Sequence, residues 1–196
     1  MSHAIASASD IEPLLERADV IALGPGLGRS DWAAGLVERL AEDGRPSVWD
    51  ADALNWLASF PTRLDSRIIT PHPGEAARLL ESTTDKIQAD RSKVLGDLQQ
   101  RYGGVAVLKG SGSLVSSASG APWLCTSGNP GMASPGMGDV LTGIIAALLS
   151  QGLKREDAAA VGVAVHAQAG DLAAKSGERG LIASDLLAEL REVINP

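Results

Sequence analysis

The sequence predicts an α/β fold built on a mostly parallel central sheet with helices on both faces. Short apolar stretches, each the length of a buried strand, alternate along the chain with segments whose apolar residues recur at helical spacing. Strands that alternate with helices in this way form parallel sheets covered on both sides. The chain has 196 residues and shows neither an internal repeat nor a linker, so we expect residues 1–196 to form a single domain.

Six short apolar segments are the predicted strands. The first four lie at 20–23, 47–49, 67–70 and 105–108, and glycine, proline or a charged residue follows each of them. Two further segments, at 114–115 and 123–124, are predicted to be antiparallel strands. Because ligands of such sheets lie beyond the carboxyl ends of the strands, the residues that follow the first four strands are candidates for a binding site.

Helix signals occupy the segments between and after the strands. Ser9-Asp10-Ile11-Glu12 matches a capping box and predicts a short helix that ends near Arg17. Ser30 and Ser184 are the predicted N-caps of two other helices. Apolar spacing and flanking glycines predict helices at about 31–43, 52–59, 75–81, 85–102, 139–151, 156–175 and 184–193.

Composition and charge exclude several classes of function. A net charge of -7 argues against nucleic-acid binding, which depends on neutralising phosphates with Lys and Arg. No apolar run approaches the roughly 18 residues that a membrane span needs, and no leader-like segment opens the chain. The single cysteine, Cys125, cannot form an internal disulfide and is interpreted as a small strand residue. We therefore expect a cytoplasmic protein that binds neither nucleic acid nor membrane.

A glycine-rich segment directly before an apolar helix is the strongest functional signal. Gly136-Met137-Gly138-Asp139 precedes the helical run, and the unpaired amides and dipole of a helix start attract anions. A phosphate-binding Walker loop would carry lysine where Asp139 stands. Asp139 is instead suited to be a base or a metal-orienting carboxylate, which makes phosphoryl transfer at this helix start a hypothesis. The alternative is a tight turn whose aspartate complements the helix dipole by ~0.3–1 kcal/mol.

This segment also carries a family resemblance. Asn129 to Ala133, followed by Gly136 to Gly143, resembles the ADP/ATP-dependent NAD(P)H-hydrate dehydratases of the ribokinase-like superfamily, and similar motifs run in family order from about Val20 to Leu190. The resemblance implies a ribokinase-like fold, here lacking the N-terminal part of the family's domain. It also implies that Asp139 is the catalytic base, in contact with the substrate, and that Gly136 and Gly138 form the anion hole.

The loop Gly24-Pro25-Gly26-Leu27-Gly28 follows the first predicted strand. A dinucleotide-binding fingerprint would require its third glycine where Arg29 stands, and the large side chain opposes close packing of helix and strand. We therefore reject an oxidoreductase of the Rossmann type. The resemblance instead implies a platform for the hydrated nicotinamide, with Gly26 in contact with the substrate.

Two carboxylates follow the second predicted strand. Asp50 and Asp52 project to the same side if the extended conformation continues. Helix capping is the alternative, and for Asp52 it is slightly favoured. The family shows a similar Asp-Ala-Asp-Ala-Leu segment, which implies a role near substrate or metal.

His72 and Glu75 follow the third predicted strand, and two prolines fix the path of the chain there. A zinc site would need a third ligand at a suitable spacing, and the sequence offers none. The resemblance implies that His72 contacts the hydrated nicotinamide nucleotide and that Glu75 orients Mg²⁺ through water. A turn histidine beside an N-terminal helix glutamate is the alternative.

The segment after the fourth predicted strand combines a cation, glycines and hydroxyl groups. A hairpin of this composition suits the phosphates of a nucleotide, although a plain surface turn explains the glycines equally well. The resemblance implies an adenine-nucleotide site. The residues assigned to it are Lys109, Gly110, Ser111, Gly112, Ser113 and Gly138. His166, on a later alanine-rich helix, is expected to be packed and hydrogen-bonded rather than chemically active.

The implied reaction repairs hydrated NADH or NADPH, in the S form, by phosphorylation of the ring hydroxyl and elimination of phosphate. ADP is the expected donor, with ATP as the other candidate, and Mg²⁺ is the expected cofactor. A homo-oligomer is expected, as is an epimerase domain fused to or paired with this one. Two alternatives are a small-molecule kinase of the same superfamily, acting on a vitamin precursor, and a catalytically inactive nucleotide sensor.

Overall fold

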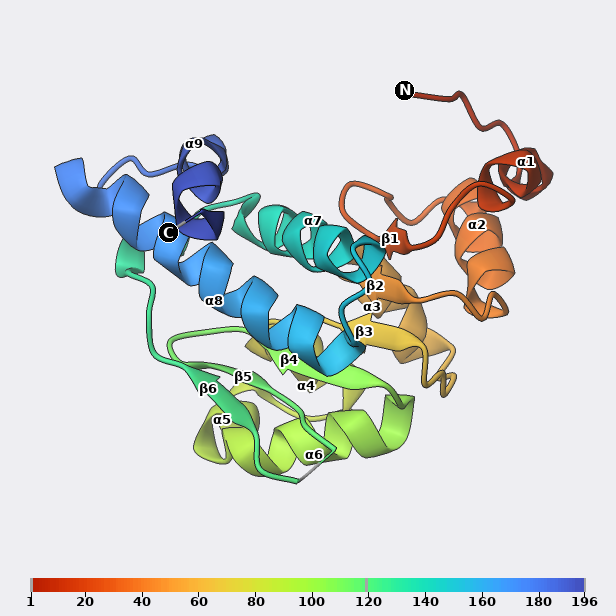
Figure 1. Cartoon of the computed structure of the whole chain (residues 1–196). Helices are drawn as coiled ribbons and strands as arrows, with labels where there is room; N and C mark the ends of the chain where they lie inside the picture. The colour runs from red at the N-terminus through yellow and green to blue at the C-terminus, as the bar shows by residue number, and fades with distance from the viewer. Residues whose placement is uncertain (1, 119, 196) are drawn as a thin grey trace.

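A six-stranded sheet forms the centre of the molecule in the computed structural model, which describes residues 2–118 and 120–195 (Figure 1). The strands follow one another across the sheet in chain order. The four parallel ones are β1 (Ile21–Leu23), β2 (Ser47–Trp49), β3 (Arg67–Ile69) and β4 (Val105–Leu108). β5 (Ser113–Val115) and β6 (Trp123–Cys125) continue the sheet in antiparallel orientation. The predicted fold class is therefore confirmed.

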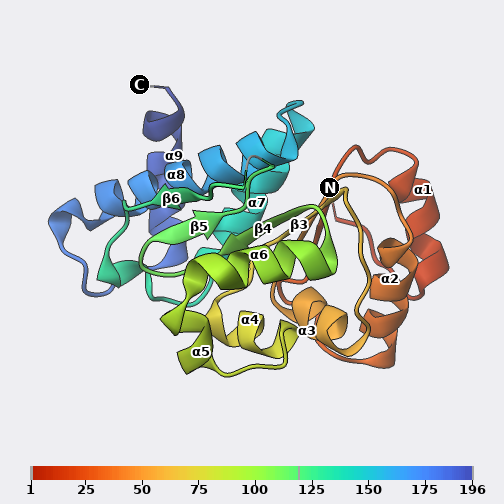
Figure 2. The same ribbon diagram turned by 90° about the horizontal axis from the view of Figure 1, so that it is seen from below.

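The helices form two layers, one on each face of the sheet (Figures 1 and 2). When parallel strands are joined in order by right-handed crossovers, the connecting helices all lie on one face. These helices are α2 (Asp31–Ala41), α3 (Asp52–Ser59), α4 (Pro73–Leu79), α5 (Thr84–Ala89) and α6 (Arg91–Tyr102). The other face is covered by α7 (Met137–Ser150) and α8 (Arg155–Ala173), against which α9 (Ala183–Ile194) packs. Short 3-10 turns occur at Ala8–Ile11, Pro130–Met132 and Ala174–Ser176.

Both faces of the strands are buried, which explains why the strands read as unbroken apolar runs. Trp49 and Ile69 pack into the cluster beneath α2 to α6, whereas their neighbours Val48 and Ile68 pack against α7 and α8. All four side chains are at most 1% exposed. Within the described residues, no helix combines the length and apolarity that crossing a bilayer requires.

The first helix begins differently from the prediction. A 3-10 turn at Ala8–Ile11 leads into α1 (Glu12–Leu15). The carboxylate of Asp10 accepts hydrogen bonds from the amides of Ala6 and Ser7 at 2.8 and 2.9 Å. The predicted box from Ser9 to Glu12 is therefore wrong, because Asp10 reaches back to the amide of Ser7 and sets the start two residues earlier.

Two other helix boundaries also correct the prediction. The helix expected at 85–102 is split into α5 and α6, because Asp90 leaves the helical conformation at φ -146° and its carboxylate accepts from the amide of Lys93 at 3.0 Å. Ser184 does not cap α9. Ile182 is the N-cap residue, and its amide donates to the carboxylate of Asp185 at 3.0 Å.

Candidate active site at the carboxyl ends of the strands

The carboxyl ends of the four parallel strands bring distant segments together. Gly24 directly follows β1 and lies against Asp50, which follows β2. A Cβ added to Gly24 would lie 1.7 Å from the Asp50 carbonyl oxygen. The hydroxyl of Thr70 donates to the carbonyl of Trp49 at 3.3 Å. The amide of Lys109 donates to the carbonyl of Pro71 at 2.9 Å. The segments after β1, β2, β3 and β4 thus form one continuous edge.

Helix α7 begins at this edge with free amides. Gly136 is its N-cap residue and adopts the left-handed conformation, with φ +85°, which turns the chain into the helix. The described residues provide no acceptor for the amides of Gly138 and Asp139. The side chain of Asp139 lies in the exposed first turn. The structure therefore places Gly136, Gly138 and Asp139 together at a helix start suited to an anion.

An ion pair between a partly buried lysine and a buried aspartate lies directly against this helix start. Lys109 Nζ is 2.7 Å from Asp50 Oδ1, and Asp50 Oδ2 accepts from the hydroxyl of Thr142 at 3.1 Å. Lys109 Nζ also lies 3.8 Å from Glu75 Oε2. A Cβ added to Gly138 would lie only 3.0 Å from Lys109 Nζ. The predicted cation and the predicted anion hole are thus adjacent.

The two carboxylates after β2 have different partners. Asp50 turns into the protein toward Lys109, whereas Asp52 Oδ2 accepts from the amide of Gly28 at 2.9 Å and so fixes the glycine loop after β1. Asp52 is the first residue of α3 rather than its cap, so the favoured capping interpretation is wrong. Gly26 lies at the exposed tip of that loop, where an added Cβ would meet no atom within 4 Å.

His72 and Glu75 cap the start of α4. His72 Nδ1 accepts from the amides of Gly74 and Glu75 at 3.0 and 3.3 Å, and Glu75 Oε2 accepts from the amide of His72 at 2.8 Å. Glu75 is 7% exposed, and His72 faces the cavity described below. No group of three or more His, Cys, Asp or Glu side chains in residues 2–118 and 120–195 is placed to hold a metal ion. Glu75 Oε2 is thus engaged in the cap, and Glu75 Oε1 lies 3.5 Å from His72 Nε2.

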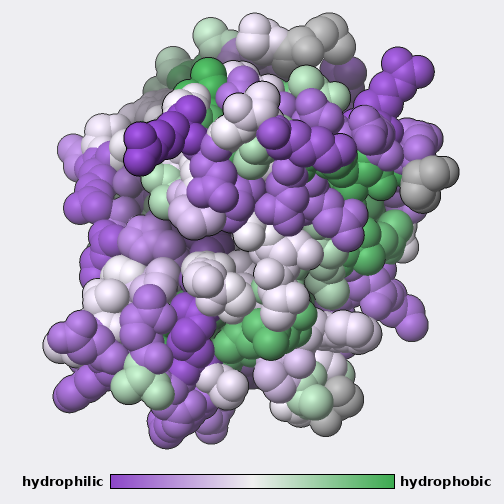
Figure 3. All heavy atoms as spheres, turned by 90° about the vertical axis from the view of Figure 1, so that its left-hand side faces the viewer, coloured by the Kyte–Doolittle hydropathy of each residue, from purple (hydrophilic) through white to green (hydrophobic). Residues whose placement is uncertain are grey.

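A cavity of about 790 Å³ opens beside the start of α7. Polar residues of the hairpin after β4 line one wall, and apolar side chains of the 126–137 segment, α7 and α8 line the other. Figure 3 views the molecule from the side on which α7 begins, where hydrophobic areas are interrupted by hydrophilic side chains. The predicted site residues that line the cavity are His72, Lys109, Gly110, Ser111, Gly112, Ser113 and Gly138. Gly26, Glu75, Gly136 and Asp139 are not among its lining residues.

Two side chains that we did not predict from the sequence hold the walls of the cavity. The Arg91 guanidinium donates to the carbonyls of Leu108 and Gly112, both at 3.1 Å, and thereby fixes the hairpin. Burial lowers the pKa of Arg91. Asp171 accepts from the amide of Gly128 at 2.9 Å and from the side-chain amide of Asn129 at 3.0 Å. The carbonyls that Arg91 holds lie 17 and 21 positions along the chain, and the partners of Asp171 lie more than 40 positions away, so no local pattern points to these contacts.

His166 lies on α8 and lines the same cavity. Burial lowers its pKa to about 4, and the nearby positive charge of Lys109 contributes to the shift. The ring is therefore neutral at pH 7. The prediction that it is packed is confirmed, and a hydrogen bond with the backbone of Met137 opposes part of the lowering of the pKa. The buried Nε2 has no hydrogen-bond partner among the described residues.

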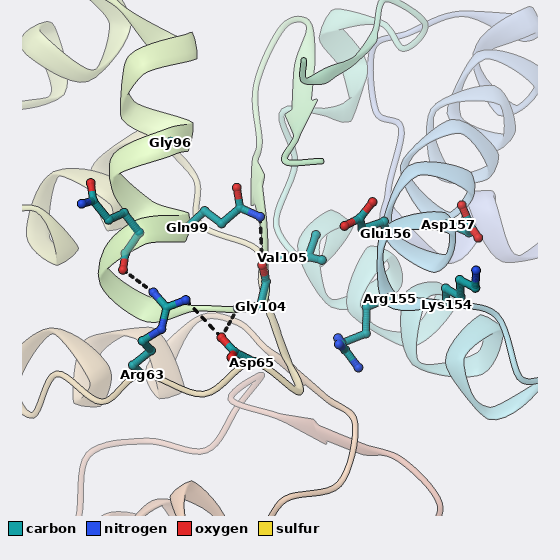
Figure 4. Close-up of a pocket in the computed structure, with 11 residues that line it drawn as sticks. Arg63, Asp65, Gly96, Gln99, Gly104, Val105, Lys154, Arg155, Glu156 and Asp157 are labelled. Atoms are coloured by element: carbon teal, nitrogen blue, oxygen red, sulfur yellow. Dashed lines mark hydrogen bonds and ion pairs between the residues drawn. The ribbon is translucent and has the colours of Figure 1, made fainter. Parts of the chain in front are cut away.

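A second hollow, of about 970 Å³, lies at the opposite end of the sheet (Figure 4). It is formed by the start of β4, the end of α6 and the start of α8. Two of its polar side chains bond within the hollow: Arg63 donates to Asp65 at 3.3 Å, and Gln99 donates to the carbonyl of Gly104 at 3.2 Å. The amino ends of parallel strands are not where such sheets bind ligands, so we place the candidate site at the other end.

Comparison with known proteins identifies the family. The sequence profile of the NAD(P)H-hydrate dehydratases matches residues 1–192. The chain belongs to this family. A bifunctional NAD(P)H-hydrate repair enzyme of Coxiella burnetii is 50% identical over the whole chain, which spans 40% of that protein. An ADP-dependent (S)-NAD(P)H-hydrate dehydratase of Neisseria meningitidis is 38% identical over 94% of the chain, which spans 66% of that protein.

Solved structures share the dehydratase fold. The ADP/ATP-dependent NAD(P)H-hydrate dehydratase of Bacillus subtilis, co-crystallised with ATP and Mg²⁺, superposes with a TM-score of 0.80 at 30% identity, over 90% of this chain and 64% of that one. A ribokinase-like superfamily protein of Enterococcus faecalis superposes with a TM-score of 0.80 at 29% identity, over 96% of this chain and 68% of that one. The predicted ribokinase-like fold is therefore confirmed.

Proposed function

We propose that this chain dehydrates the S form of hydrated NADH or NADPH at the expense of an adenine nucleotide. The observation that carries the proposal is the start of α7, where free amides, the carboxylate of Asp139 and the ammonium of Lys109 lie side by side. Family membership and the names of the relatives from Neisseria meningitidis and Bacillus subtilis support this substrate and donor.

The proposed reaction begins with phosphoryl transfer. Asp139 takes the proton of the ring hydroxyl while the hydroxyl oxygen attacks the terminal phosphorus of the adenine nucleotide. The bond between that phosphorus and the rest of the nucleotide breaks at the same time. The amides of Gly136 and Gly138 stabilise the charge on the moving phosphoryl group, and Lys109 supplies a positive charge beside them. Loss of phosphate from the ring, with a proton from the neighbouring carbon, then restores the ring double bond and the reduced cofactor.

The substrate lies, in this proposal, between the glycine loop after β1 and the start of α4. Gly26 gives the backbone room for close approach, and the exposed ring of His72 contacts the hydrated nucleotide. The adenine nucleotide occupies the cavity between the hairpin, from Lys109 to Ser113, and α8. Hydrated nicotinamide and nucleotide thus meet at Asp139.

Mg²⁺ is the proposed cofactor, and when bound with the nucleotide it neutralises phosphate charge. Glu75 is the residue that would orient it through water, and the relative from Bacillus subtilis was crystallised with ATP and Mg²⁺. We propose ADP as the principal donor, by analogy with the ADP-dependent relative. A cytoplasmic location, a homo-oligomer and an accompanying epimerase domain belong to the same proposal. The last is in keeping with the bifunctional repair enzymes that the chain resembles.

The test is a spectroscopic assay with hydrated NADH, Mg²⁺ and either ADP or ATP. We expect the absorbance of NADH to return, faster with ADP, and we expect Asp139→Asn to reduce the rate about 10²- to 10⁴-fold while still binding ADP. Accumulation of a stable phosphate ester without return of NADH would show a small-molecule kinase instead. Nucleotide binding without any turnover would show an inactive sensor.

A further inference from the structure

We propose that Asp50 is a positioning residue for phosphoryl transfer, and that with Thr142 it holds the ammonium of Lys109 against the start of α7. The inference rests on the proposed function and adds to it residues with no direct contact to substrate. Its basis is the chain of contacts from Thr142 through Asp50 to Lys109, which ends beside Gly138.

Asp50 is a buried carboxylate whose two oxygens are both engaged. It is 1% exposed, at the carboxyl end of β2. Oδ1 meets Lys109 Nζ at 2.7 Å, and Oδ2 accepts from Thr142 at 3.1 Å. Because a buried charge is costly unless it is paired and hydrogen-bonded, these contacts fix the carboxylate in one orientation.

Thr142 connects this carboxylate to the helix that carries the anion site. It is 2% exposed and lies four residues after Gly138, so both residues occupy the same face of α7. An added Cβ at Gly138 would lie 3.2 Å from Asp50 Oδ2 and 3.0 Å from Lys109 Nζ. Glycine at this position thus lets the helix start rest directly on the ion pair.

Lys109 needs such a support because its side chain is long and flexible. Its side chain is 18% exposed and lines the cavity, and Glu75 Oε2 lies on another side of the ammonium at 3.8 Å. An ammonium has three hydrogens to donate, and among the described residues Asp50 is the only one whose carboxylate lies at close hydrogen-bond distance from it. Asp50 therefore determines where the positive charge lies, and the remaining hydrogens are available to a phosphate above Gly138.

Fold stability alone does not account for this arrangement. Replacing a buried ion pair with apolar side chains of similar volume is often neutral or stabilising. Precise placement of a charge beside a reacting group, by contrast, has a large effect on rate, since a misplacement of about 1 Å can reduce turnover about 10²-fold. The observed geometry fits the second role.

The first test compares Asp50→Asn with Asp97→Asn. Asp97 pairs with Lys93 at 2.6 Å on the exposed side of α6, so it offers the same chemical change in a lysine-paired aspartate away from the site. We expect Asp50→Asn to lower kcat at least ten-fold while the Kd for ADP changes less than three-fold, and Asp97→Asn to change neither. Structural damage would instead lower the Tm together with kcat, and the Thr142 variants described below then decide.

A double-mutant cycle tests whether Asp50 acts through Lys109. If it does, Asp50→Asn lowers kcat no further once Lys109→Met is present, whereas independent effects multiply. Should Asp50→Asn fail to fold, Thr142→Val keeps both charges and releases the carboxylate, and we expect it to lower kcat at least three-fold. Thr142→Ser retains the hydroxyl and should restore most of this loss. Wild-type kcat in both Asp50→Asn and Thr142→Val, or multiplying effects in the cycle, would overturn the inference.

Failure of the proposed function gives a different result. A wild-type protein that binds ADP but restores no NADH contradicts the proposed function and leaves the position of Lys109 to be tested in crystals of Asp50→Asn with ADP. There, an ammonium displaced from Gly138 supports the inference, and an unmoved ammonium overturns it.

Discussion

Replacing Gly138 with alanine adds one methyl group at the most crowded point of the proposed phosphoryl site. Its Cβ would lie 3.0 Å from Lys109 Nζ and 3.2 Å from Asp50 Oδ2, whereas ordinary contact begins at 3.4 Å, so the ion pair must move by about 0.4 Å. From the sensitivity of rates to such misplacement, we expect kcat/KM to fall about ten- to a hundred-fold, or about 1.4–2.7 kcal/mol.

Gly143→Ala is the matched control on the same helix. Gly143 is exposed, and an added Cβ would meet no atom within 4 Å. This variant should gain up to about 1 kcal/mol of stability from helix propensity and keep its activity. The measurements are kcat/KM in the hydrated-NADH assay and the Tm of both proteins. If Gly138→Ala is as active as Gly143→Ala, the adjacency of the ion pair and the helix start has no catalytic importance.

Three further predictions concern the supports of the site. Gly24→Ala should lower the free energy of unfolding in urea by about 3 kcal/mol or more, because its Cβ would lie 1.7 Å from the Asp50 carbonyl oxygen and the backbone there has φ +121°. An unchanged urea midpoint would contradict the close approach of the segments after β1 and β2. Burial lowers the pKa of His166 from 6.5 to about 4, so folding favours the neutral ring. The associated stability is present above pH 6.5 and is lost as the pH falls toward 4. Urea titrations at several pH values should show that the free energy of unfolding of His166→Gln falls about 3 kcal/mol less than that of the wild type between pH 6.5 and 4. The same dependence on pH in both proteins would refute a buried neutral ring. Asp171→Asn should lower the free energy of unfolding by about 1–2 kcal/mol, because it weakens the bonds that hold Gly128 and Asn129, and an unchanged value would show that this segment needs no such anchor.

Local sequence signals predicted the strands and most helices well. The apolar runs that end just before Gly24, Asp50, Pro71 and Lys109 correspond to β1 to β4. They were recognisable as unbroken runs because strands of a buried parallel sheet need no polar face. Helix starts were less accurate where several polar residues compete for one role. Near the N-terminus, the carboxylate that accepts from the backbone amides before the helix is that of Asp10, and a spacing rule alone does not distinguish Asp10 from Glu12.

The site was predictable as a set of segments but not as a set of partners. Glycines and prolines marked each loop at the carboxyl edge, and parallel topology brings these loops together. The pair of Asp50 and Lys109 joins residues 59 positions apart, and Thr142 is 92 positions from Asp50. Such contacts depend on how segments far apart in the sequence pack together, which no local pattern in the sequence encodes. Arg91 was missed for the same reason.

A crystal structure of the protein with ADP and Mg²⁺ tests the central claim most directly. We expect the terminal phosphate to lie within hydrogen-bond distance of the Gly138 amide, beside Lys109 and facing the carboxylate of Asp139. A terminal phosphate bound elsewhere, with no anion at the start of α7, would contradict it.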